Sequence, residues 1–347
     1  MSTYDPPPEE ISPQRNLPPV QPPTAGFIVQ LFVIPALVVL VIVLVWLLFN
    51  WLAHMGGNPA SYVEAMKANR ANSWQQAYNL AEELQRNEAA RNDPELAKDV
   101  AGFLSELLAQ PLPKYEPEEK HKRHLRSEEA KRRGFLCQAL GQFRTTEYTV
   151  PVLVAAAAPA NEKDESALQV RVAALQALAV LSDNVRQTKP LNDPRVIQTL
   201  TRASADDETI VADAGTFGLG VVGGPEAIGQ LKKILAEARP PDVHYNAALA
   251  LARHGDMAAL ELAKEMIDPA TTRGLADPED QKGKGRAAKQ ARLQLNGLRA
   301  VQQLAKCNPQ ADLSSLIPVI ERLTGTDPPP VVKSEAGVVL RELKERN

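Results

Sequence analysis

Gly218, Gly220 and Gly223 have the glycine spacing of a dinucleotide-binding loop. That chemistry needs a strand before the glycines, a helix that opens at them, and an acidic residue about 20 positions further on. The preceding segment, residues 211–215, instead fits a repeated helical pattern, and Gly223 falls where that helix must end. We therefore expect the glycines to let two helices approach closely, and we expect no cofactor.

Two other sets of residues, two histidines and two cysteines, are of types that can bind a metal ion. His121 and His124 are three positions apart, but no third ligand is near them, and their charged neighbours favour a solvated helix face. Cys137 and Cys307 are too few for a disulfide framework or a four-ligand zinc site. The sequence therefore predicts no metal centre.

The common catalytic motifs are absent from this sequence. It contains no GxSxG, HExxH, Walker loop or paired-cysteine motif. His244 and His254 lie on one predicted helix near opposite faces, and His254 takes a position that leucine fills elsewhere in the pattern. We expect His254 to be packed rather than catalytic, and we predict that the chain is not an enzyme.

A cluster of cations without an acidic residue lies in the last quarter of the chain. Its five members fall within eleven positions: Lys282, Lys284, Arg286, Lys289 and Arg292. Beside a membrane, such a basic patch could contact anionic head groups or an acidic partner. The alternative is a mobile surface loop.

Four basic residues recur at one position of the repeated helix, directly after its first residue. They are Arg133, Arg171, His244 and Lys333. On stacked helices they would line one face, where they could hold an acidic partner. The alternative is that they pair with acids at nearby turns, such as Asp183, Asp207 and Asp256.

The repeated pattern is clearest in Val243–Asp256. Small residues stand four, five and seven positions after Val243, an apolar residue stands at eight, and a Gly-Asp turn ends the helix. The same spacing begins at residues 73, 132, 170, 211, 243, 293 and 332. Second helices are expected between these starts, over residues 93–110, 146–158, 194–205, 225–238, 257–267 and 313–323.

This pattern resembles the HEAT-like repeats of bacterial proteins, including the class named after phycobiliprotein lyases. The resemblance covers roughly residues 60–345, and it implies a curved superhelix that binds other proteins. Helix pairs at a period near 40 residues are typical of an α-solenoid. We predict an all-α protein with about seven helix pairs over residues 73–347, interrupted near 111–128 and 268–288.

The most apolar run lies near the N-terminus. Leu31–Phe49 contains 19 residues without a charged or strongly polar side chain. As a helix this run spans about 28 Å, close to the thickness of a bilayer's hydrocarbon core. We expect a transmembrane anchor over residues 27–55 rather than a cleaved signal peptide, because no basic segment precedes the run and no small-residue cleavage site follows it.

The segments on either side of this anchor differ in composition. Residues 1–26 contain eight prolines and are predicted to be a disordered tail. Residues 56–72 are predicted to form a joint and the region of the first helical turn, because Gly56-Gly57 and Asn58-Pro59 disfavour a continuous helix.

Charge distribution limits the choice of location and function. Lys67 and Arg70 after the span outnumber Arg15 before it, so the positive-inside rule favours a cytoplasmic C-terminal part and a single pass through the inner membrane. A net charge of -3 disfavours nucleic-acid binding. We expect a membrane-tethered scaffold or adaptor with an unidentified protein partner and no small-molecule substrate. The alternatives are an enzyme or enzyme subunit of the lyase-like HEAT class, and a solenoid that binds nucleic acid or anionic lipid.

Overall fold

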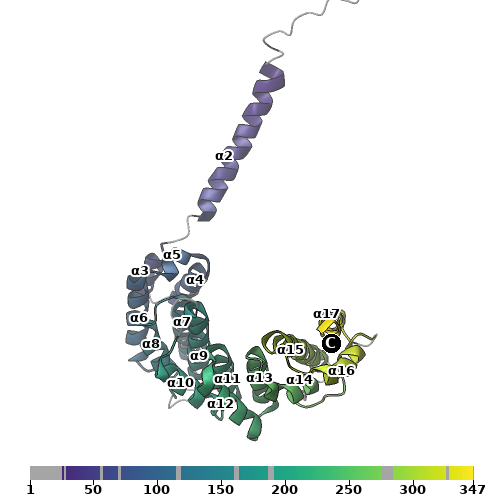
Figure 1. The fold of residues 1–347 in the computed structure, drawn as a ribbon. Coiled ribbons are helices and arrows are strands. Elements are labelled where there is room, and N and C mark those ends of the chain that lie inside the picture. Colours follow the sequence, from purple (N-terminus) through teal and green to yellow (C-terminus); the bar gives the residue numbers. More distant parts are fainter. Residues whose placement is uncertain are drawn as a thin grey trace, which may run out of the picture. The chain divides into compact units, whose positions relative to one another are not determined.

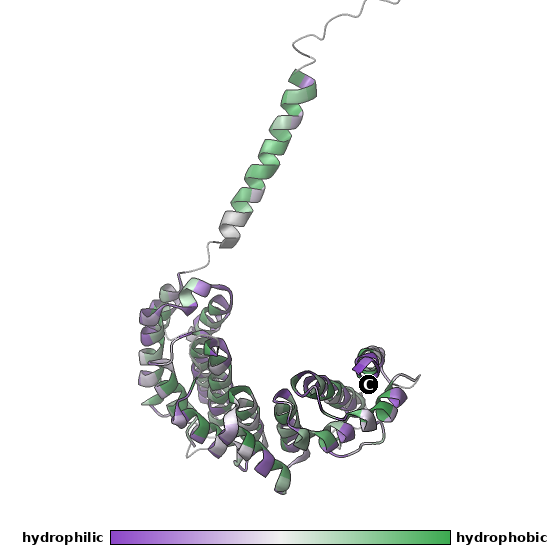
Figure 2. Cartoon of the chain, in the orientation of Figure 1, coloured by the Kyte–Doolittle hydropathy of each residue, from purple (hydrophilic) through white to green (hydrophobic). Residues whose placement is uncertain are grey.

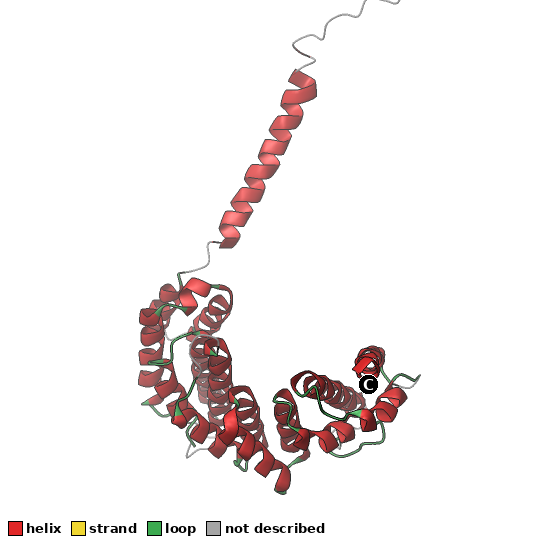
Figure 3. Cartoon of the chain, viewed as in Figure 1, coloured by secondary structure: helices red, strands yellow, loops and turns green. Residues whose placement is uncertain are grey.

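The computed structural model describes residues 26, 29–54, 58–68, 72–114, 119–159, 164–186, 191–275, 284–325 and 328–346. Within these ranges every regular element is a helix and no strand occurs (Figure 3). The predicted all-α class is therefore confirmed. The chain divides into two compact units, Met1–Gly56 and Gly57–Asn347. Apart from Gly26, the predicted proline-rich tail lies outside the described residues.

The first unit contains the apolar helix. A π-helical turn, η1 (Val29–Val33), leads into α2 (Ile34–His54). Residues Val29–Phe49 have a mean hydropathy of 3.3, and none of them is buried within the protein; the hydrophobic colouring of α2 is visible in Figure 2. This helix is long and apolar enough to span a membrane.

The second unit begins with a helix inside the predicted joint. The Asn58 side chain accepts a hydrogen bond from the backbone of Ala60 at 3.2 Å, and α3 (Pro59–Ala68) follows with proline in its first turn. Val63 and Met66 are buried, and α3 packs against the next two long helices, α4 (Ser73–Arg86) and α6 (Pro94–Leu108). The Asn-Pro pair therefore starts a new helix, separate from α2.

A first row of helices carries the repeated pattern. It consists of α4, α7 (Lys120–Gln142), α9 (Glu165–Val185), α11 (Thr209–Val222), α13 (Pro241–Arg253), α15 (Lys284–Cys307) and α17 (Pro330–Arg346). Each member packs against the next in this order (Figure 1). All seven predicted starts fall inside these helices, although α7 already begins within the segment predicted as the first insertion.

A second row lies between them in sequence. It consists of α6, α8 (Thr149–Ala156), α10 (Pro194–Ser204), α12 (Gly224–Ala236), α14 (Leu260–Ile267) and α16 (Ile317–Leu323). Each packs on the first-row helix that follows it. The one-turn helix α5 (Glu88–Arg91) and two 3-10 turns, η2 (Met257–Ala259) and η3 (Ser314–Leu316), complete the elements. Asp93 and Asp193 cap α6 and α10 with their side chains, and proline follows each of them.

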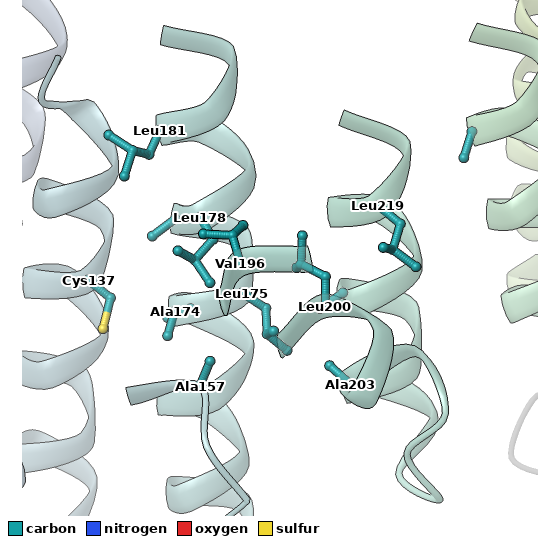
Figure 4. Packing of buried hydrophobic residues seen from close by; sticks show 14 of the residues in the cluster. Cys137, Ala157, Ala174, Leu175, Leu178, Leu181, Val196, Leu200, Ala203 and Leu219 are labelled. Atoms are coloured by element: carbon teal, nitrogen blue, oxygen red, sulfur yellow. The ribbon is translucent and has the colours of Figure 1, made fainter. Parts of the chain in front are cut away.

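The core lies between the two rows. Leu178 of α9, Val196 and Leu200 of α10, and Leu219 of α11 are fully buried in one cluster (Figure 4). Small residues let the first-row helices approach each other, since a Cβ on Gly141 would lie 2.9 Å from a backbone atom of α9. Burial of these apolar side chains is the main stabilising contribution to such an array.

Side chains tie the C-terminal ends of the first-row helices together. Asn184 Nδ2 donates to the Gly141 carbonyl at 3.0 Å, His254 Nε2 donates to the Gly220 carbonyl at 2.8 Å, and Asn308 Nδ2 donates to the Gly255 carbonyl at 3.1 Å. Arg186 similarly reaches the Val221 carbonyl. These bonds satisfy carbonyl groups at or near helix ends that have no partner within the helix. The expectation that His254 is packed rather than catalytic fits this position.

Candidate binding groove

The glycines with dinucleotide-loop spacing lie in a helix. Gly218 and Gly220 are inside α11, and Gly223 ends it with φ of 70°. A Cβ on Gly218 would come within 2.4 Å of the Leu200 side chain, and one on Gly220 would come within 2.4 Å of the Ala250 Cβ. The close-packing interpretation is confirmed, because these glycines let α11 approach α10 and α13.

Arg133 and Arg171, two of the four recurring basic residues, are buried and paired within the chain. Arg133 Nε lies 2.8 Å from Glu129 Oε1, and Arg133 Nη2 donates to the Gln110 carbonyl at 3.0 Å. Arg171 Nη2 lies 2.9 Å from Asp206 Oδ2. Their exposed fractions are 6% and 5%, so neither guanidinium group is presented to a partner.

His244 and Lys333, the other two recurring residues, differ from each other. His244 is buried, its Nε2 donates to the Glu237 carbonyl at 2.9 Å, and its Nδ1 lies 2.6 Å from Arg273 Nη2. Lys333 is exposed on α17. The structure thus assigns three of the four positions to contacts within the helical unit and does not bring the four together as one surface.

The basic patch is mostly helical. Lys282 lies outside the described residues, and Lys284 is the first residue of α15. Arg286 and Arg292 are exposed on this helix, and Lys289 Nζ lies 3.4 Å from Asp242 Oδ2 on α13. From Lys284 onward these cations therefore occupy the first turns of a helix rather than a surface loop.

The histidine pair and the cysteines form no metal site in the described part of the chain. His121 and His124 are exposed on α7, and His124 Nε2 lies 3.3 Å from Glu128 Oε1. Cys137 is buried and Cys307 is exposed, and both are free thiols. Across the described residues, no three or more His, Cys, Asp or Glu side chains gather closely enough to hold a metal ion.

A groove runs along α13 between α11 and α15. It consists of a hollow of about 280 Å³ beside the N-terminal half of α13 and one of about 360 Å³ beside its C-terminal half. Asn246, Leu249 and Asn296 line both hollows and so connect them. From Asp242 to Arg253, the groove follows α13 for about 16 Å at the helical rise per residue.

The N-terminal half of the groove carries charges of both signs. The charged residues that line it are Asp213, Asp242, Arg273, Lys289 and Arg292. Asp213 Oδ1 is buried and has no hydrogen-bond partner among the described residues. Burial, followed by the negative charge of Asp242, raises the pKa of the Asp213 carboxyl to about 6. The Asn246 side chain makes a hydrogen bond to this carboxyl group, and the Asp213 Oδ1 atom remains available to accept a hydrogen bond from a bound group.

The C-terminal half of the groove combines cations with an uncovered aromatic ring. Arg253 and Arg299 line it and are exposed. Arg299 Nη1 donates a hydrogen bond to Asn296 Oδ1 at 3.4 Å, and neither arginine has an ion-pair partner in the described part of the chain. Phe217 is 44% exposed on the wall formed by α11. An aromatic side chain beside arginines is a common composition at the centre of protein interfaces.

A larger hollow of about 530 Å³ lies among α4, α6 and α7. Trp74 lines it together with Arg132 and Arg133. Both arginines share the carboxylate of Glu129 inside the protein, and Glu106 and Glu128 line the same hollow, so its arginines already have carboxylates beside them. The groove along α13 is the better candidate site, because two of its cations, Arg253 and Arg299, have no carboxylate partner among the described residues.

Several groove residues recur at equivalent positions of the pattern. Asn246 and Asn296 stand three positions after their repeat starts, and Arg253 stands ten after its start. Phe217 and Arg299 stand six positions after theirs. Positions three, six and ten share one face of a helix, so polar residues at these positions were the available signal for the groove.

Comparisons with known proteins give no relative from which a function could be transferred. No protein family matches this chain, and no curated protein matches it either. The functional argument therefore rests on the groove and on the apolar helix α2.

Proposed function

We propose that the protein is a membrane-anchored scaffold that binds a segment of a partner protein in the groove along α13. In this proposal the helical unit is an α-solenoid of about seven HEAT-like helix pairs. The sequential packing of the first row, with each second-row helix on the first-row helix that follows it, supports this assignment. The proposal gives the chain no catalytic activity of its own.

The observation that carries the proposal is the chemistry of the groove. Phe217 is uncovered, Arg253 and Arg299 have no carboxylate partner among the described residues, and the amides of Asn246 and Asn296 line the groove between the two hollows. A peptide segment supplies all the complementary groups, namely apolar side chains, charges and backbone amides. A small apolar ligand would leave the asparagines and arginines unsatisfied.

The apolar helix α2 supports the membrane part of the proposal. Anchoring would confine the helical unit to the membrane surface and raise its effective concentration for partners there. The excess of Lys67 and Arg70 over Arg15 favours an orientation with the helical unit in the cytoplasm.

Site-specific photo-crosslinking in cells tests this function. A photoreactive phenylalanine analogue replaces Phe217 in the full-length chain, and a matched control carries it at Gln198, which is exposed on α10 of the second row. We expect a discrete protein adduct from position 217 in membrane fractions and none from position 198. Identical adducts from both positions, or adducts with lipid or nucleic acid alone, would contradict the proposal.

A further inference from the structure

The two halves of the groove differ in net charge. In the N-terminal half, two acids and three cations line the hollow. Lys289 pairs with Asp242, and Arg273 pairs with Glu265, which leaves Asp213 to balance Arg292. In the C-terminal half, Arg253 and Arg299 line the hollow, and no acidic side chain among the described residues does so. The groove is therefore electrically balanced near Asp242 and positive near Arg253.

Helix stability alone does not account for this positive end. Arg253 lies in the last turn of α13, where a cation interacts favourably with the helix dipole. Arg299 lies two turns before the end of α15, where that effect is small. Other first-row arginines, such as Arg133 and Arg171, pair with a carboxylate of this chain.

The same half also presents apolar side chains. Phe217 is 44% exposed and Leu249 is half-buried. A segment that covers them removes water from Arg253 and Arg299 as well. Desolvating an unpaired arginine is costly, whereas a bidentate carboxylate compensates for that cost.

We propose that the partner segment is acidic, with carboxylates on both sides of an apolar side chain. The apolar side chain contacts Phe217 and Leu249, and the carboxylates pair with Arg253 and Arg299. The groove length of about 16 Å accommodates about five residues of extended chain. This inference rests on the proposed function, and it specifies the chemistry of the partner.

The sequence preference of the groove is measured with a random library of 12-residue peptides. The full-length protein is held in nanodiscs of phosphatidylcholine, so that the lipid itself carries no net charge. We expect the retained peptides to be enriched in Asp and Glu around an apolar residue, relative to the input library. In the double variant R253E/R299E, this preference is lost or shifts towards Lys and Arg.

A second double variant with the same change of charge is the control. R202E/R341E alters exposed arginines on α10 and α17, outside the groove. It should keep the acidic preference. For the best acidic peptide, fluorescence anisotropy should show a Kd about tenfold higher, or more, in R253E/R299E, and a change below about twofold in R202E/R341E. Circular dichroism of both variants verifies that they fold.

The remaining outcomes separate this inference from the proposed function. Peptides that bind without an acidic bias, and that Phe217→Ala weakens, would overturn the inference and leave the scaffold function standing. An equal loss in both double variants would also overturn the inference, because it would indicate an effect of net charge. If the protein binds no peptide but binds nanodiscs that contain phosphatidylserine, the groove binds anionic lipid instead of a peptide, and both proposals fail.

Discussion

Gly220 has no space for a side chain, because a Cβ there would lie 2.4 Å from the Ala250 Cβ. We expect Gly220→Ala to lower the free energy of unfolding by about 1–3 kcal/mol, since α11 and α13 must separate. Denaturant titration followed by circular dichroism measures this. Gly229→Ala is the matched control, because nothing lies within 4 Å of a Cβ at Gly229 on α12. It should raise stability by about 0.5–1 kcal/mol.

Asp213 makes stability depend on pH in the mildly acidic range. Its pKa in the folded protein is about 6, above the ordinary 3.8, so its ionised form destabilises the fold and its protonation stabilises it. Asp213→Asn should therefore be more stable than the wild type above pH 6, and the difference should shrink as pH falls towards 4. Denaturation curves at pH 8, 6 and 4.5 measure this. A difference that is constant with pH would contradict the assignment.

For Arg171, the sequence predicts the position of the cation in the repeated pattern but not its ion-pair partner. The position of this cation in the repeat was visible in the sequence. Its partner is Asp206, directly before the Asp207 that was considered as an alternative. Burial decides how the side chain is used, and burial depends on how the next helix packs, which spacing along one helix does not specify.

At the level of helices, local signals were sufficient for most of the fold. The apolar and small-residue spacing located the first row, and caps such as Asp93 and Asp193 located the starts of second-row helices. The helix α3 lies in the segment predicted to hold a joint and a first helical turn. Asn58-Pro59 marks its start, because Asn58 caps the helix with its side chain and proline is favoured in the first turn.

Glu129 is part of the polar contacts between α7 and α4, the first two helices of the first row. It pairs with Arg132 and with Arg133 on α7, and Arg132 also reaches Ser73 at the start of α4 at 3.1 Å. Glu129→Ala removes the carboxylate that two buried guanidinium groups share. We expect a loss of about 3–5 kcal/mol in the free energy of unfolding, measured by denaturant titration.

Glu106→Ala provides the comparison for this change. Glu106 is exposed on α6 and has no described ion pair. Like Glu129, it lines the hollow among α4, α6 and α7. Its substitution should alter stability by about 0.5 kcal/mol or less. Equal effects of the two substitutions would mean that Glu129 acts as a surface charge and not as a buried partner.

For the whole chain, we expect the two units to be separable. The buried side chains of the second unit come from residue 63 onward, and the described apolar residues Val29–Phe49 are not buried in the protein. Deletion of residues 1–57 should therefore leave a soluble, helical, monodisperse protein, as measured by circular dichroism and size-exclusion chromatography. In the cell it should no longer fractionate with membranes. Aggregation of the truncated protein would indicate that the removed residues belong to its core.

The groove is formed by helices that pack together in the folded chain, so the sequence predicts only part of it. Lys289 and Arg292 belong to the predicted basic patch, whereas Asp213, Phe217 and Arg253 belong to no site predicted from the sequence. These residues come from three helices far apart in sequence. They share a surface because α13 packs against both α11 and α15, a relation that no single helix encodes.

The order of packing in the first row also determines how the protein responds to a pulling force. If the N-terminus is held and a partner in the groove is pulled, the tension passes through the α4–α7, α7–α9 and α9–α11 interfaces in turn, and α11, α13 and α15 share it within the groove. Such interfaces behave as springs in series: each carries the full tension, their extensions add, and the weakest separates first. Beyond the groove, α17 carries none of that tension, so the C-terminal end of the row stays relaxed while the N-terminal part stretches.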